Sequence, residues 1–423
     1  MLNTNNITEV NVEEQARKAQ KAGKPLSMLS TNDKNQALLT IADELEKEYA
    51  FILEENQKDL TIGKEKNFES AFMDRLLLTQ ERVKDFANGL REVARLDDPV
   101  GDILSEWTLD NGLNVKKIRV PLGVIGMIYE ARPNVTVDAT GLALKSGNSI
   151  ILKGGSSALF SNKAIVSVIH RALEKTKIPV DAVQFIASTD RSATEQLFTL
   201  KQYIDVLIPR GGGSLIETVV NKATIPVLET GVGNVHVYVD SEADEEKALN
   251  IIINAKTNRP AVCNALETIL VHKDWFSNHK DSLISKLNEY HIMVHGDTEV
   301  VKAIPGSIQA EEKDWAEEYL SLDLAVKIVN DIQEAIDHIE KYGTKHSEAI
   351  ITENQKAATQ FIQEVDAAAV YHNASTRFTD GSALGFGAEI GISTQKLHAR
   401  GPMGLPALTT TKFCILGNGQ IRE

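Results

Sequence analysis

Cys263 is the residue of this chain whose chemistry is most informative, and the sequence contains one other cysteine, Cys414. The apolar run 268–272 follows Cys263 closely, so we expect Cys263 on a turn or short helix that leads into a core strand. A thiol at a strand end is exposed yet held by rigid structure, which is the geometry a nucleophile needs. The alternative is a buried cysteine that packs as a small hydrophobic side chain.

Two glycine-containing turns could hold the phosphates of a dinucleotide. The sequence 209–214 reads Pro-Arg-Gly-Gly-Gly-Ser and lies between an apolar strand and an amphipathic helix; 153–157 reads Lys-Gly-Gly-Ser-Ser and follows another strand. Glycine lets the backbone approach a ligand, and a helix N-terminus offers free N–H groups. The sequence lacks G-x-G-x-x-G after a strand and G-x-x-x-x-G-K-[ST]. Each turn alone could be a tight turn without a ligand, but two at strand ends of one sheet favour a dinucleotide.

Two further residues have alternative interpretations. Asn134 lies at a strand end, where its side-chain amide could donate to a developing oxyanion or could cap the helix that follows. Glu229 precedes a glycine turn and could be a general base or could terminate a strand. The segment 385–404 combines glycines with Lys396, His398 and Arg400, which suggests a ligand loop, the alternative being a solvated surface loop. We expect no metal, because no third ligand accompanies the two histidines at 291 and 295.

The spacing of apolar residues predicts an α/β protein. The first hundred residues have helical periodicity, including a helix that begins near Thr79, and 121–240 alternates short strands with helices, as parallel sheets require. This rhythm repeats near 269–271 and 349–351, which predicts a second α/β unit. Asn111-Gly112 predicts a hairpin over 107–120. The strand-like tail at 408–416 could pair with this hairpin or with a partner subunit.

The bulk properties exclude several classes of protein. A chain of 423 residues is long enough for two or three domains, and its net charge of −14 argues against nucleic-acid binding. The N-terminus has no signal-peptide pattern, and no apolar run is long enough to span a membrane. Two cysteines without a disulfide framework fit a reducing compartment. We therefore expect a cytoplasmic protein with no nucleic-acid or membrane partner.

Six motifs, in order along nearly the whole chain, resemble those of the aldehyde dehydrogenase superfamily and, within it, of the gamma-glutamyl phosphate reductases. They lie at 128–136, 205–212, 229–240, 259–264, 375–381 and 391–405. The resemblance implies two Rossmann-like α/β domains plus a small β oligomerisation flap. It places an NADP-binding domain at 1–230, with a C-terminal return near 371–400 and the flap hairpin near 107–120, a catalytic domain with Cys263 at 231–370, and an oligomerisation tail at 405–423.

The resemblance also implies roles for individual residues. Cys263 would be the nucleophile, and Asn134 would form the oxyanion hole with the backbone N–H of Cys263. NADPH would be bound by residues in and beside the two glycine turns: Lys153, Gly155, Ser156, Arg210, Gly211, Gly212 and Ser214. Glu229, which matches the water-activating glutamate of hydrolytic members, is placed with these cofactor residues. Lys153 would lie near the 2′-phosphate, where this family often has arginine.

The chemistry of an acyl phosphate further predicts cations in this acidic protein. Lys256 and Arg259 are candidates for lowering the pKa of the Cys263 thiol and for receiving the departing phosphate. The remaining candidates for binding the substrate anions are Arg132, Lys396, His398 and Arg400.

The implied reaction is the NADPH-dependent reduction of L-glutamyl 5-phosphate to L-glutamate 5-semialdehyde through a thioester of Cys263, the second step of proline biosynthesis from glutamate. The alternative is a hydrolytic NAD(P)-dependent aldehyde dehydrogenase with Glu229 as general base. Glutamate 5-kinase is a candidate partner, because it would supply the acyl phosphate. An edge strand in the flap predicts a homo-oligomer, a dimer or a tetramer.

Overall fold

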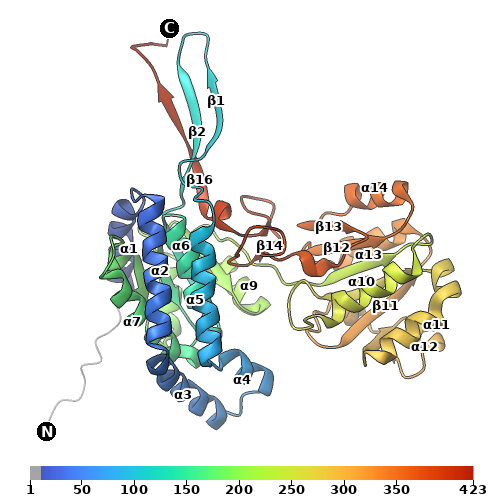
Figure 1. Ribbon diagram of the computed structural model, residues 1–423. Helices are drawn as coiled ribbons and strands as arrows, with labels where there is room; N and C mark the ends of the chain where they lie inside the picture. Colours follow the sequence, from blue (N-terminus) through green and yellow to red (C-terminus); the bar gives the residue numbers. More distant parts are fainter. Residues whose placement is uncertain (1–10, 423) are drawn as a thin grey trace. The chain divides into compact units, whose positions relative to one another are not determined.

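The computed structural model describes residues 11–422, which divide into two compact units (Figure 1). The first unit contains the chain up to Glu229, with Phe386–Ile390 and Met403–Glu423. The second unit contains Thr230–Gly385 and Gly391–Pro402.

The C-terminal return to the first unit differs from the sequence prediction. Most of the segment 371–400, which was predicted to return to the cofactor domain, belongs to the second unit. The reason is that strand β13 (Ala369–His372) pairs with β12 (Ser347–Ile351) and so extends the sheet of the second unit. Within this segment, only Phe386–Ile390 belongs to the first unit.

Helices come first along the first unit, as the apolar periodicity predicts. Helix α5 begins after Thr79, whose hydroxyl accepts a hydrogen bond from the Arg82 N–H at 3.2 Å, and its apolar side chains recur at helical spacing toward the core. Among the described helices, none is both long enough and apolar enough to cross a membrane. The helices are α1 (Val12–Leu26), α2 (Thr31–Lys47), α3 (Tyr49–Glu65), α4 (Ser70–Leu76) and α5 (Gln80–Arg95).

A parallel sheet in the order β5-β4-β3-β6 forms the centre of the first unit. The register pairs Ile128 with Lys153 and Tyr129 with Arg210, so the carboxyl ends of three strands meet at one edge. The strands are β3 (Val124–Tyr129), β4 (Ser149–Lys153), β5 (Val183–Phe185) and β6 (Val206–Arg210). The connecting helices are α6 (Pro133–Lys145), α7 (Leu159–Leu173), α8 (Arg191–Leu197) and α9 (Gly213–Lys222).

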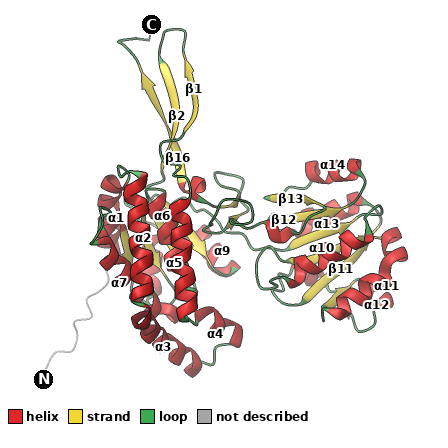
Figure 2. Cartoon of the chain, viewed as in Figure 1, coloured by secondary structure: helices red, strands yellow, loops and turns green. Residues whose placement is uncertain are grey.

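A three-stranded antiparallel flap also belongs to the first unit (Figure 2). The predicted hairpin is β1 (Ile103–Thr108) and β2 (Asn114–Pro121), and the tail strand β16 (Thr409–Leu416) pairs with β2. Of the two pairings that the sequence left open, the chain therefore makes the one with its own hairpin. The outer strands expose large apolar side chains, among them Trp107 and Phe413, whose rings lie 6.2 Å apart.

The second unit contains a parallel sheet in the order β10-β9-β11-β8-β7-β12-β13, flanked by helices. This is the second α/β unit that the sequence predicts, and its strands and helices enclose a buried hydrophobic core. The remaining strands of this sheet are β7 (Val235–Val239), β8 (Leu266–His272), β9 (Met293–Gly296), β10 (Ile308–Gln309) and β11 (Asp323–Val329). The helices are α10 (Glu245–Thr257), α11 (Lys273–Glu289), α12 (Thr298–Ala303), α13 (Ile332–Tyr342) and α14 (Gln355–Glu364).

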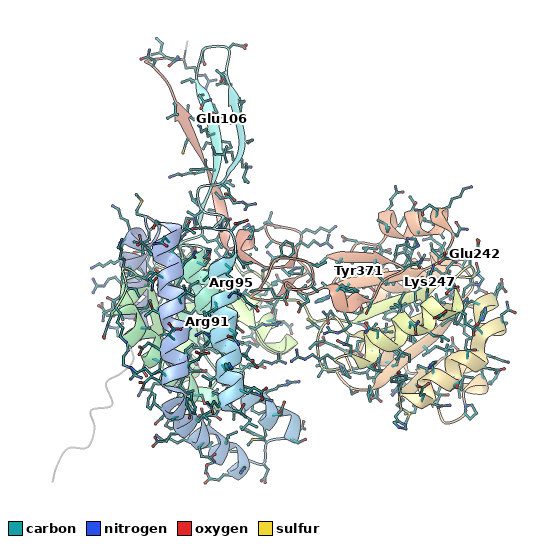
Figure 3. All side chains as sticks on the ribbon, in the orientation of Figure 1. Arg91, Arg95, Glu106, Glu242, Lys247 and Tyr371 are labelled. Atoms are coloured by element: carbon teal, nitrogen blue, oxygen red, sulfur yellow. The ribbon has the colours of Figure 1, made fainter. Side chains whose placement is uncertain are left out.

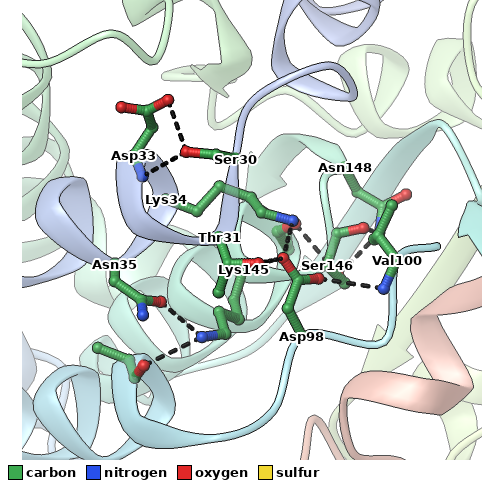
Figure 4. Close-up of polar contacts among 12 residues, drawn as sticks. Ser30, Thr31, Asp33, Lys34, Asn35, Asp98, Val100, Lys145, Ser146 and Asn148 are labelled. Atoms are coloured by element: carbon green, nitrogen blue, oxygen red, sulfur yellow. Dashed lines mark hydrogen bonds and ion pairs between the residues drawn. The ribbon is translucent and has the colours of Figure 1, made fainter. Parts of the chain in front are cut away.

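Two buried lysines fasten α2 to its neighbours in the first unit (Figure 4). Lys34 forms an ion pair with Asp98 at 2.5 Å, and the side chains of both residues are less than a tenth exposed. Lys145 donates to the Asn35 side chain at 2.5 Å and to the Ala94 carbonyl at 3.0 Å, and burial lowers the pKa of its ammonium group. Because unpaired buried charge is costly, these contacts fix where α2, α5 and α6 meet.

We expect Lys34→Ala to lower the free energy of unfolding by about 3 kcal/mol, because Asp98 would keep its buried charge without its ion-pair partner. Urea unfolding followed by circular dichroism measures this change. The matched control on the same helix is Lys47→Ala, because Lys47 is exposed and 3.9 Å from Glu44. The control should change stability by less than about 0.5 kcal/mol, and an equal loss in both variants would contradict the prediction.

Candidate active site

Cys263 lies on the turn between α10 and β8 in the second unit, as the sequence predicts. Its side chain is half-buried. The turn is closed by a hydrogen bond from the Ala265 N–H to the Val262 carbonyl at 3.0 Å. The glycine loop around Gly233 crosses this turn so closely that a Cβ at Gly233 would lie 1.5 Å from the Cys263 carbonyl oxygen. The turn that carries the thiol therefore lies at the start of β8, directly against the glycine loop around Gly233.

The segment 375–379 is hydrogen-bonded to Asn264, the residue that follows Cys263. The Asn264 side chain donates to the Thr379 carbonyl at 2.8 Å and to the Arg377 carbonyl at 3.4 Å. The Thr376 hydroxyl donates back to the Asn264 carbonyl at 2.9 Å. Tyr371, labelled on β13 in Figure 3, forms a hydroxyl–hydroxyl hydrogen bond with Thr379 at 2.8 Å. These bonds fix the segment 375–379 beside the turn of Cys263.

Arg377 on this segment is a residue that the sequence did not single out. Its Nε donates to the Asn258 side chain at 3.2 Å, and the guanidinium is half-buried. Burial lowers the pKa of Arg377, and the nearby charge of Arg259 lowers it further. Asp380 and Cys263 raise it. Arg377 therefore lies within electrostatic reach of Arg259 and of Cys263. The only sequence signal for Arg377 was its position inside the motif at 375–381.

Lys256 is a structural residue, which corrects its prediction as a substrate cation. Its ammonium lies 2.6 Å from Glu267, and both side chains are completely buried. Burial lowers the pKa of Lys256 and raises the pKa of Glu267 to about 7. The sequence placed Lys256 near Cys263, but α10 turns this side chain into the core, where no substrate anion can reach it.

The predicted cations of the C-terminal segment gather around a carboxylate that the sequence did not single out. Lys396 and Arg400 lie 2.9 and 2.8 Å from Asp366, and Lys345 lies 3.3 Å from it. Hydrogen bonds from Lys396 and Arg400 hold the pKa of Asp366 well below its usual range. His398 lies between them in a left-handed conformation, with φ of 68°. Three cations thus share one carboxylate.

In the first unit, the predicted cofactor residues gather at the carboxyl edge of the sheet. Lys153 ends β4 and Arg210 ends β6, on either side of β3. From β3 the chain continues to β4 and β5 on one side and then returns to β6 on the other, so the strand order reverses beside β3. Open α/β sheets bind ligands at such a reversal. Lys153 is 7% exposed, its ammonium donates to the Gly154 carbonyl at 3.0 Å, and burial lowers its pKa.

The turn after β6 fits a phosphate. Residue 211 must be glycine because the side chain of Glu130, which the sequence did not single out, occupies the space of a Cβ. A Cβ at Gly211 would lie 2.6 Å from the Glu130 carboxyl carbon. At Gly212 the nearest atom to a Cβ is 3.8 Å away, so this position is open. No described side chain caps the start of α9 at Gly212, and Ser214 in its first turn is exposed. The first N–H groups of α9 can therefore receive an anion. Gly155 and Ser156 occupy the corresponding turn after β4.

Asn134 is in the first turn of α6, but it is not the cap of that helix. The N-cap position is Arg132, and the Asn134 amide instead donates to the Asp138 carboxylate at 3.0 Å. This bond orients the amide. Burial raises the pKa of Asp138 to about 6, against the opposing effects of the Asn134 hydrogen bond and of Arg210. Glu229, the last residue of the first unit, is half-buried.

We expect Asp138→Asn to become more stabilising relative to the wild type as the pH rises. The folded-state pKa of Asp138 is about 6, above its ordinary value of 3.8. The wild type therefore has its full stability below about pH 4 and loses stability as the pH rises through 6. The difference in melting temperature between the variant and the wild type should widen from pH 4.5 to pH 7 and then level. A difference that is constant with pH would contradict this prediction.

Comparison with known proteins identifies the family. The aldehyde dehydrogenase family model matches residues 1–322. The chain is 64% identical over all 423 residues to gamma-glutamyl phosphate reductase 2 of Bacillus licheniformis, with complete coverage of both chains. It is 57% identical over 406 residues to gamma-glutamyl phosphate reductase of Bacillus cereus, covering 96% of this chain and 98% of that protein. The chain belongs to the aldehyde dehydrogenase family and, within it, to the gamma-glutamyl phosphate reductases.

Solved structures agree with this assignment. The crystal structure of gamma-glutamyl phosphate reductase from Thermotoga maritima has a TM-score of 0.95 and 48% identity, covering 97% of this chain and 100% of that one. An acetylating aldehyde dehydrogenase from Geobacillus thermoglucosidasius, at 18% identity and a TM-score of 0.72, shares the fold; the alignment covers 97% of each chain. The predicted family and aldehyde dehydrogenase-like fold are confirmed. The protein is an oxidoreductase that acts on a small molecule, and its family implies a nicotinamide cofactor.

Proposed function

We propose that the protein reduces L-glutamyl 5-phosphate with NADPH to L-glutamate 5-semialdehyde and phosphate, the second step of proline biosynthesis from glutamate. The observation that carries this proposal is the half-buried thiol of Cys263 on a fixed turn, within electrostatic reach of Arg377. A thiolate is a strong nucleophile and a fair leaving group, which a reaction through a thioester requires. The full-length identity to relatives named gamma-glutamyl phosphate reductase gives the substrate.

The first half of the reaction uses residues of this chain alone. The Cys263 thiolate attacks the acyl carbon, a carbon–sulfur bond forms, and the carbon–oxygen bond to the phosphoryl group breaks. The electron pair of that bond leaves with phosphate. The Asn134 amide, oriented by Asp138, would donate to the oxygen of the tetrahedral intermediate, and such a donor typically contributes about 3 kcal/mol to lowering the barrier.

NADPH, when bound, supplies the hydride that converts the thioester into the aldehyde oxidation state. The N–H groups that begin α9 and the turn of Gly155 and Ser156 would hold its phosphates. Lys153 would neutralise the 2′-phosphate, and the anion would in turn favour the charged form of this buried ammonium. The hemithioacetal then releases the aldehyde and regenerates the Cys263 thiolate.

The flap supports an expectation of self-assembly. Its outer strands, β1 and β16, expose apolar side chains, and edge strands of this kind pair readily with another chain. We infer that the protein forms a homo-oligomer, a dimer or a tetramer, through this flap, and that it works in the cytoplasm. Glutamate 5-kinase, which would make the acyl phosphate, is the candidate partner.

The experiment that tests the proposed function is NADP⁺ reduction with glutamate 5-semialdehyde, with and without phosphate. We expect activity only when phosphate is present, because the reverse reaction must resolve the thioester with phosphate. Activity that is indifferent to phosphate would overturn the proposal and would favour hydrolysis with Glu229 as base. Replacing NADP⁺ by NAD⁺ should lower activity, because the contact of Lys153 with the 2′-phosphate would be lost.

A further inference from the structure

The second unit contains two guanidinium groups, those of Arg377 and Arg259, that form no ion pair with any residue among 11–422. The Arg377 side chain binds Asn258 only through Nε, and its two terminal nitrogens have no hydrogen-bond partner among residues 11–422. Arg259 is exposed and forms no hydrogen bond or ion pair with any described residue. A half-buried guanidinium with open terminal donors, fixed beside the turn of a nucleophile, is suited to bind an oxyanion at two oxygens.

The backbone around Arg377 is built to hold this side chain in place. Its carbonyl accepts from Asn264, which follows Cys263 directly, and its Nε donates to Asn258, which caps the end of α10. The arginine is thus fastened to both sides of the turn that carries the thiol. A side chain fixed in this way loses little conformational entropy when it binds a ligand.

We propose that Arg377, assisted by Arg259, binds the phosphoryl group of the acyl phosphate and makes the enzyme specific for a phosphorylated substrate. This inference rests on the proposed function. The role of phosphate-binding cation thereby passes from Lys256, which is buried in an ion pair with Glu267, to Arg377, which the sequence analysis did not single out.

The position of Arg377 decides which anion of the substrate it binds. In glutamyl 5-phosphate, one oxygen atom separates the phosphorus from the carbon that Cys263 attacks. The α-carboxylate carbon is separated from that carbon by three others. Because the Arg377 backbone is hydrogen-bonded to Asn264, the neighbour of Cys263, and its Nε to Asn258 at the end of α10, we assign its guanidinium to the phosphoryl oxygens, which leave from the attacked carbon.

The chemistry of the step fits an arginine at this position. Before the reaction, a guanidinium near the sulfur stabilises the thiolate over the thiol. During the attack, negative charge moves from sulfur to the leaving phosphate as the carbon–oxygen bond breaks. A planar guanidinium can bind two phosphoryl oxygens at once, which an ammonium cannot do. In the reverse direction, the same fork would hold inorganic phosphate in position to attack the thioester.

The test is the phosphate dependence of NADP⁺ reduction in three variants of the full chain: Arg377→Gln, Arg377→Lys and the control Arg191→Gln. Arg191 is an exposed arginine on α8 of the first unit. Arg377→Gln should raise the KM for phosphate about tenfold to a hundredfold, with a change of less than about twofold in the KM for the semialdehyde. Arg377→Lys should give a smaller increase, and Arg191→Gln should behave as the wild type.

A binding measurement separates recognition from turnover. Inorganic phosphate should slow the alkylation of Cys263 by iodoacetamide in the wild type, and this protection should require more phosphate in Arg377→Gln. A wild type that needs phosphate, combined with an unchanged KM for phosphate in Arg377→Gln, would overturn the inference and leave the proposed function intact. A wild type that works without phosphate would overturn the proposed function itself. If Arg377→Gln fails to fold, the KM for phosphate in Arg377→Lys decides the question.

Discussion

Cys263→Ser should lower the rate of phosphate-dependent NADP⁺ reduction by at least about a thousandfold, because a serine hydroxyl at neutral pH is a poor nucleophile and its alkoxide a poor leaving group. The substitution replaces sulfur by oxygen in a half-buried side chain, so the fold should be retained. Initial rates at saturating phosphate and semialdehyde, together with the melting temperature of each protein, measure the two effects.

The chain supplies its own matched control for this variant. Cys414 is also half-buried, but it lies on β16 of the flap. Cys414→Ser should retain the activity of the wild type, and iodoacetamide should inactivate Cys414→Ser as fast as it inactivates the wild type. Substantial activity in Cys263→Ser would eliminate the thioester mechanism. Loss of activity in Cys414→Ser alone would show that the flap, and not the turn of Cys263, controls catalysis.

The sequence predicted those parts of the fold that depend on local pattern. The helix that follows Thr79, the hairpin at Asn111-Gly112 and the turn that carries Cys263 are confirmed, because caps, turn residues and apolar periodicity act over a few residues. Strand β6 begins at Val206, since the carboxylate of the preceding Asp205 accepts a hydrogen bond from the Val124 N–H before the ladder begins. Pro209 is tolerated because β6 lies at an edge of its sheet.

The parts of the site that the sequence missed depend on contacts between distant positions. Arg377 is brought to Cys263 by hydrogen bonds between the 375–379 segment and Asn264, more than a hundred residues away along the chain. Asp366 becomes the partner of Lys396 and Arg400 only because the chain folds back across 30 or more residues. Lys256 shows the opposite error: it is near Cys263 in sequence, but helix geometry turns it inward. Resemblance identified the motifs but not which side chains within them meet.

Gly233→Ala should lower kcat by at least about a hundredfold, because the position has no room for a Cβ. An added Cβ would lie 1.5 Å from the Cys263 carbonyl oxygen and 2.8 Å from its Cα, so the glycine loop or the turn of Cys263 must move. The loop cannot move freely, since the Gly233 N–H donates to the Glu318 carboxylate at 2.8 Å. A displacement of about 1 Å at a reacting group can cost a hundredfold in rate. Initial rates measured well below the melting temperature test this expectation.

The expected signature of Gly233→Ala is a displaced thiol in a folded protein. The melting temperature should fall by several degrees, but the variant should unfold cooperatively, and the alkylation rate of Cys263 should differ from that of the wild type. Gly23→Ala on α1 is the matched control: a Cβ there would lie 3.4 Å from the Ser149 hydroxyl, which is ordinary contact. It should retain full activity, since alanine favours a helix. Wild-type kcat in Gly233→Ala would mean that this loop does not hold the nucleophile. The hydrogen bond between the Gly233 N–H and Glu318 would then contribute to stability alone. Burial raises the pKa of the Glu318 carboxyl, and this hydrogen bond opposes the rise.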